Sequence, residues 1–144
     1  MRIFTVAAFV FLSATAIAGE LYENYSVYGK ANGQSYQFTA TKAEFAKTPA
    51  WRVGTEHPPL APRRAEEIAR RQLQQLVPGG ADWRLEGITV LPLGDDLHWV
   101  YSVEFSPPLR PDVAVIMGDY MRLLVLFDGS VIKPKVTPIP PIPR

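Results

Sequence analysis

The side chains with the widest chemical repertoire in this 144-residue chain are its two histidines, His57 and His98. A Ser/His/Asp triad would need one of them within reach of a serine, but His57 precedes a proline pair and the chain has no G-x-S-x-G sequence. Cysteine is absent, which removes thiol nucleophiles and cysteine-metal sites. We therefore predict no catalytic residue. One enzymatic alternative stays open, a small hydrolase or lyase in which His98 acts with Glu104 or Asp96.

One short cluster, formed by Asp95, Asp96 and His98, contains side chains that could ligate a metal. Gly94 precedes it, and aspartate after glycine is typical of a hairpin turn because its carboxylate can accept nearby backbone amides. A calcium or zinc site would need further ligands at defined spacing. We therefore interpret the cluster as a turn and predict no metal and no cofactor. Paired carboxylates for glycoside cleavage are not indicated by any spacing either.

The segments on both sides of this turn have the periodicity of strands. Residues 83–91 predict one strand, with a bulge at Glu86 and Gly87 because the apolar phase changes there. The next strand alternates cleanly, so one face is expected in the core and the other outward. The inward set is Leu97, Trp99, Tyr101, Val103 and Phe105, and the outward set is His98, Val100, Ser102 and Glu104.

A single amphipathic helix is predicted to cover the inward set. It begins at Pro62, a favoured first helical residue, and continues to about Leu76, before a Val-Pro-Gly-Gly sequence ends it. Its apolar stripe is Ala65, Ile68, Ala69, Leu73 and Leu76. Glu66 and Glu67 each stand four residues before an arginine, Arg70 and Arg71, so the other face is expected to be solvated and ion-paired.

Two further regions flank this core. Residues 20–40 predict an N-terminal hairpin turning at Asn32 and Gly33, followed by a short helix with a capping box from Thr41 to Glu44. A proline-rich connector over residues 48–63 then leads to the main helix, and we expect Trp51 to anchor it at the edge of the core.

After the core strands, residues 120–127 are apolar on both faces, which favours a central strand. Asp128 and Gly129 predict a turn that returns through residues 130–132. Residues 113–117 form a short apolar run with no assigned role. From 134 to 144 five of eleven residues are proline, so this tail is expected to be extended or disordered. Its two P-x-x-P patterns leave open whether it is a spacer or a recognition motif.

The first 18 residues resemble a cleavable secretory signal peptide. Met1 and Arg2 give a positive start, an apolar run follows, and Ala16-Ile17-Ala18 matches the peptidase site, so we predict cleavage after Ala18. The apolar run is shorter than the roughly 20 residues needed to cross a bilayer. We therefore expect a periplasmic or secreted protein with no stable membrane insertion after cleavage. Loss of Arg2 leaves 14 basic and 14 acidic residues, which argues against a nucleic-acid partner.

These patterns predict an α+β fold, in which one amphipathic helix packs on an antiparallel β-meander of three to four strands with an N-terminal hairpin. The chain divides into a signal peptide (1–18), the hairpin with its short helix and connector (19–60), the helix-and-sheet core (61–133) and the proline-rich tail (134–144).

The sequences PRRAEEIARRQL, ITVLPLGDDLHWVYSVEF and LLVLFDGSVI together resemble the helix-and-meander layout of PepSY domains, and more loosely that of cystatin-like folds. The chain also resembles small exported bacterial proteins of unassigned function. PepSY domains are extracytoplasmic modules thought to bind or restrain peptidases and carry no catalytic residues. The resemblance therefore implies a non-catalytic envelope binding module with a protein or peptide partner. A scaffold protein that uses its proline-rich tail is the alternative.

Overall fold

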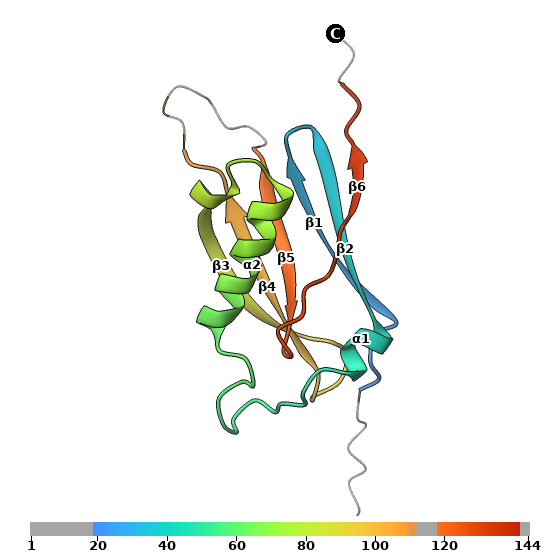
Figure 1. Cartoon of the computed structure of the whole chain (residues 1–144). Coiled ribbons are helices and arrows are strands. Elements are labelled where there is room, and N and C mark those ends of the chain that lie inside the picture. Colours follow the sequence, from blue (N-terminus) through green and yellow to red (C-terminus); the bar gives the residue numbers. More distant parts are fainter. Residues whose placement is uncertain (1–18, 110, 112–117, 142–144) are drawn as a thin grey trace, which may run out of the picture.

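The computed structural model describes residues 19–109, 111 and 118–141, and in these residues one antiparallel sheet carries a single long helix on one face (Figure 1). The expectations for residues 1–18 and 113–117 lie outside the described residues. Along the chain the elements are β1 (Asn24–Ala31), β2 (Gln34–Thr41), α1 (Lys42–Ala46), α2 (Pro62–Leu76), the 3₁₀ turn η1 (Gly80–Asp82), β3 (Arg84–Pro92), β4 (Trp99–Ser106), β5 (Tyr120–Leu126) and β6 (Lys135–Pro138).

The α+β class is confirmed, but the sheet has six strands in the order β3-β4-β5-β1-β2-β6 rather than three to four. The N-terminal hairpin is part of this sheet, because β1 pairs with β5 through Gly29↔Met121 and Lys30↔Tyr120. A Cβ at Gly29 would lie 3.2 Å from the Met121 Cα and 3.3 Å from the Tyr120 carbonyl oxygen, so glycine eases the close approach of the two strands. The sequence did not predict this pairing because periodicity reports which residues face a core and not which distant strand lies alongside.

Helix α2 has the predicted bounds and packs across β4 and β5 (Figure 1). Ala65, Ala69 and Leu73 are fully buried, while Ile68 and Leu76 are partly buried against the same core. On the sheet, Tyr101, Val103 and Phe105 lie beneath the helix and are fully buried. Two expected members differ. Leu97 is exposed and precedes β4, and Trp99 is only partly buried, because residues 93–98 form the turn between β3 and β4.

The polar face of α2 is ion-paired, although not in the pattern expected. Glu66 binds Arg70 as predicted, with 2.9 Å between carboxylate and guanidinium. Arg70 also donates to the carbonyl of Trp83 and lies over the Phe105 ring, so its side chain covers this part of the core. Glu67 binds Arg64, one turn earlier, rather than Arg71.

The local features of the N-terminal region are confirmed. The hairpin turns at Asn32 and Gly33, which both have positive φ, and the capping box of Thr41 and Glu44 is present. Trp51 anchors the connector as expected: its ring packs against Trp99 and Phe127, and its backbone N–H donates to the carbonyl of Leu97.

Part of the proline-rich tail belongs to the sheet. β6 pairs with β2 from Gln37↔Lys135 to Gln34↔Pro138, and the N–H of Ile139 donates to the carbonyl of Gly33. The return after Asp128 and Gly129 makes a single bridge between Val125 and Val131. The described part of the tail is thus extended, and over Lys135–Pro138 it is paired with β2 through its backbone.

The face of the sheet opposite α2, called here the helix-free face, carries the alternate residues of each strand. The predicted bulge at Glu86 and Gly87 is present and keeps β3 in phase with β4. Ser102 and Val100 were expected to face outward, and both lie on the helix-free face, yet both are buried. Leu124 and Leu126 of β5 are buried there as well, whereas the part of this face around Glu104 and Arg122 is open to solvent.

Candidate functional site

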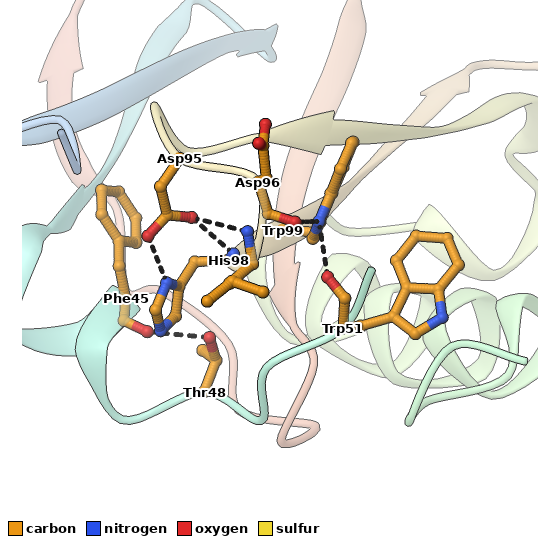
Figure 2. Close-up of polar contacts among 8 residues, drawn as sticks. Phe45, Thr48, Trp51, Asp95, Asp96, His98 and Trp99 are labelled. Atoms are coloured by element: carbon orange, nitrogen blue, oxygen red, sulfur yellow. Dashed lines mark hydrogen bonds and ion pairs between the residues drawn. The ribbon is translucent and has the colours of Figure 1, made fainter. Parts of the chain in front are cut away.

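The predicted turn between β3 and β4 is held by one carboxylate. Asp95 Oδ1 accepts the backbone N–H groups of Leu97 and His98 at 2.9 and 2.7 Å, and Asp95 Oδ2 lies 2.6 Å from His98 Nδ1 (Figure 2). Figure 2 shows the His98 ring on the side of the turn where Phe45 and Thr48 lie. The turn chemistry expected from the sequence is therefore confirmed, and the carboxylate also fixes the orientation of an imidazole.

The charge of Asp95 follows from this environment. Burial raises the pKa of the carboxyl group, but the hydrogen bonds from the His98 side chain and from the backbone amides of His98 and Leu97 outweigh it and lower the pKa below its ordinary value. Asp95 is thus a carboxylate near neutral pH. A carboxylate that orients an imidazole occurs in many acid-base catalysts. A catalytic site would also need a substrate cleft beside the imidazole.

The enzymatic alternative paired His98 with Glu104 or Asp96, and the structure pairs it with Asp95 instead. Glu104 stands six positions further along the strand, about 20 Å away at roughly 3.3 Å per residue, and it binds Arg122 at 3.0 Å. The backbone carbonyl of Asp96 accepts the Trp99 indole N–H. His57 is exposed in the connector.

Over the described residues, no group of three or more His, Cys, Asp or Glu side chains is arranged to hold a metal ion. In the same part of the chain, no helix combines the length and apolar character that crossing a membrane requires.

The helix-free face contains two adjoining hollows, which together form what we call the outer groove. Both are lined by Tyr25, Glu104 and Arg122, and their volumes are about 710 and 380 Å³. The larger extends over β3 and β4 and is also lined by Glu86, Gly87, Thr89, Leu91, Ser102 and Ser106. The smaller lies beside β1, which pairs with β5 at only two positions, and is also lined by Ser26, Val27, Tyr28 and Tyr120.

Fixed ion pairs occupy the polar part of the outer groove. Arg122 of β5 donates to Glu104 of β4, its cross-strand neighbour. At the bulge, Glu86 accepts hydrogen bonds from Ser106 and Arg84, and these bonds lower the pKa of its carboxyl group. Glu86 is therefore ionised near neutral pH and cannot serve as a general acid.

Exposed tyrosines rim the same groove. Tyr28 of β1 is 51% exposed and Tyr120 of β5 is 40% exposed, on either side of the β1–β5 junction. Tyrosine and arginine are among the residues most enriched at the energetic centres of protein interfaces, because each combines a large contact area with a directional hydrogen-bonding group. The combination of Tyr28, Tyr120 and Arg122 around a hollow thus has the composition of a binding surface.

A third hollow, of about 650 Å³, lies beside η1, and its lining includes three prolines with Trp83, Asp82 and Asp119. Its lining residues Leu109 and Gly118 flank a segment that is largely outside the described residues. We therefore place no site there.

The sequence did not single out the outer groove. Of its polar residues, Ser102 and Glu104 were predicted to face outward, but Arg122 and the tyrosines come from β1 and β5, and the β1–β5 pairing was not predicted. The concentration of tyrosine at positions 22, 25 and 28 was the one available indication. Comparisons of the chain with protein-family models, curated proteins and solved structures gave no significant match.

Proposed function

We propose that this protein is an extracytoplasmic, non-catalytic binding module that recognises a protein or peptide partner through the outer groove. The observation that carries this proposal is the grouping of Tyr28, Tyr120 and Arg122 around a hollow on a sheet face that no described helix covers. Such a surface offers aromatic contact area and a partly exposed ion pair, Arg122–Glu104, that can hydrogen-bond to a partner.

Binding is favoured over catalysis by the state of the groove's carboxylates. Glu104 is held by Arg122 and Glu86 by Arg84 and Ser106, so both are tied to structural partners. The oriented imidazole of His98 lies in the β3–β4 turn and not among the groove's lining residues. A hydrolase would need the reactive groups and the substrate hollow in one place.

Export is supported by the sequence of residues 1–18, and the resemblance to PepSY domains supports the same class of function. The alternative of a scaffold that binds through its proline tail has less support, because Pro138 of the first P-x-x-P pattern lies within β6. Intact-mass measurement of the exported protein tests the first part, with a chain beginning at Gly19 expected. A mass that retains residues 1–18 would contradict it.

The binding role is tested by capture from envelope extract with the mature protein as bait, followed by affinity measurement on the purified partner. Arg122→Ala and Tyr28→Ala are each expected to weaken binding at least tenfold, since hot-spot residues typically contribute 2 kcal/mol or more. Arg71→Ala, an exposed arginine on the solvent face of α2, is the matched control and should bind normally. Normal binding by both groove variants would overturn the proposal, as would partner turnover that His98→Ala abolishes.

A further inference from the structure

The two edges of the sheet are protected to different degrees. β6 is four residues long, contains Lys135 and Pro138 and follows Pro134. Short length, lysine and proline are the usual means by which proteins prevent an edge strand from pairing with another chain. β3, at the opposite edge, is nine residues long and has no neighbour on its outer side among the described residues.

Within β3 the protective features are confined to its ends. Arg84, Glu86 and the bulge are at the start, and Pro92 is at the finish. Residues 87–91 between them read GITVL, an uncharged run rich in β-branched side chains. A run of this kind has a high propensity to pair with a further strand.

The side chains of this run are incompletely covered on the helix side. Ile88 and Val90 face the same side as Tyr101 and Val103, yet they are only partly buried because α2 packs across β4 and β5. A strand added beside β3 would place its own side chains next to Ile88 and Val90 and remove this apolar surface from water.

On the opposite side, the same run borders the outer groove. Gly87, Thr89 and Leu91 all line the larger hollow. A Cβ placed on Gly87 would have no atom within 4 Å, so the bulge leaves an open notch at the edge. A large side chain on a neighbouring strand can fill such a notch, as aromatic residues do when they cover a glycine across a sheet.

We propose that the outer edge of β3, over residues 87–91, binds an extended peptide segment of the partner by strand addition. The segment it fits is uncharged at its centre, carries aliphatic or β-branched residues toward Ile88 and Val90, and places one large side chain at the Gly87 notch. This inference rests on the proposed function and names its ligand class. Hydrogen bonds between the peptide backbone and β3 supply affinity, and the outer groove selects among the peptide side chains that point toward it.

A second copy of this chain fits the edge less well. Stable dimers bury about 800 Å² per partner through some 20 to 30 residues on each side, and a nine-residue edge strand supplies far fewer. A peptide needs only one strand's length of contact. The open edge beside a hollow therefore matches a linear segment better than a globular surface.

A phage-displayed library of random linear nine-residue peptides, selected against the full mature protein, is the direct probe. We expect enrichment of alternating aliphatic and aromatic sequences whose affinity falls at least tenfold for Thr89→Lys, which places a charge on the edge strand where it borders the larger hollow. Thr137→Lys, at the matching exposed position of β6, should leave the affinity within about twofold. Absence of enriched peptides, equal effects of the two variants, or Thr89-dependent dimerisation in place of peptide binding would overturn the proposal.

Backbone pairing is separated from side-chain binding by N-methylating the best peptide one residue at a time. An added strand directs every second N–H toward β3, so methylation should abolish binding at alternate positions and be tolerated at those between. Loss at every position or at none would overturn strand addition. If partner binding depends on Arg122 and Tyr28 while Thr89→Lys has no effect, the proposed function stands and this inference fails.

Discussion

On the α2 side of β4, Tyr101, Val103 and Phe105 are fully buried, whereas on the helix-free face the same strand presents Glu104 to Arg122 beside an open hollow. The helix side removes apolar surface from water, which is the main source of folding free energy. Around the outer groove, the helix-free face presents ion pairs and half-exposed tyrosines, which stabilise a small domain little, whereas Val100, Leu124 and Leu126 on the same face are buried. The comparison indicates that the residues beneath α2 stabilise the fold more than those around the outer groove, where we propose that the partner binds.

The strongest test of this division is Leu73→Ala on α2. Leu73 is fully buried, so its truncation leaves a cavity and should lower the free energy of unfolding by about 2–5 kcal/mol. Gln74→Ala, exposed on the same helix, should change it by less than about 0.5 kcal/mol. Chemical denaturation measures both, and equal losses would mean that α2 does not pack through this stripe.

A smaller effect is expected from Tyr101→Phe on the covered face. The hydroxyl donates to the carbonyl of Leu60 at 2.6 Å, so its removal should cost about 1 kcal/mol. Burial raises the pKa of Tyr101 above its ordinary value of 10.0, which means that the unfolded chain ionises first as pH rises. The advantage of the wild type should therefore be complete below pH 10 and shrink above it. Denaturation of both proteins from pH 7 to 11 measures this, and a constant difference would contradict the assignment.

The smallest stability effect is expected on the helix-free face, from Arg122→Ala. The Arg122–Glu104 pair is partly exposed, with side chains 45% and 39% accessible, so its loss should cost less than about 0.5 kcal/mol. The same variant is expected to lose partner binding. A stability loss comparable with that of Leu73→Ala would show that this face is part of the folding core and would remove the contrast between the faces.

The sequence predicted the elements that depend on local chemistry. The bounds of α2, the turn at Asn32 and Gly33, the capping box of Thr41 and the bulge at Gly87 each follow from residues within a few positions of one another. The number of strands was wrong because β1 and β6 join the sheet through pairings between distant segments. Those pairings depend on the whole core and leave no local pattern.

For the candidate site the same limit applies. The role of Asp95 in the turn was predictable, since its partners are two and three residues away. The outer groove was not, because Tyr28, Tyr120 and Arg122 come from strands brought together only by the β1–β5 junction. The Val136 pairing with Tyr36 was likewise hidden, since the prolines around it favour unpaired chain.

The β1–β5 junction also determines how late in synthesis the sheet can fold. Gly29 and Met121 are 92 positions apart, so no growing chain can form the centre of the sheet until nearly all of it has been made. Closing so long a loop before its contacts form slows folding. Under the proposed export, such a delay would keep the polypeptide unfolded until most of its residues had crossed the membrane.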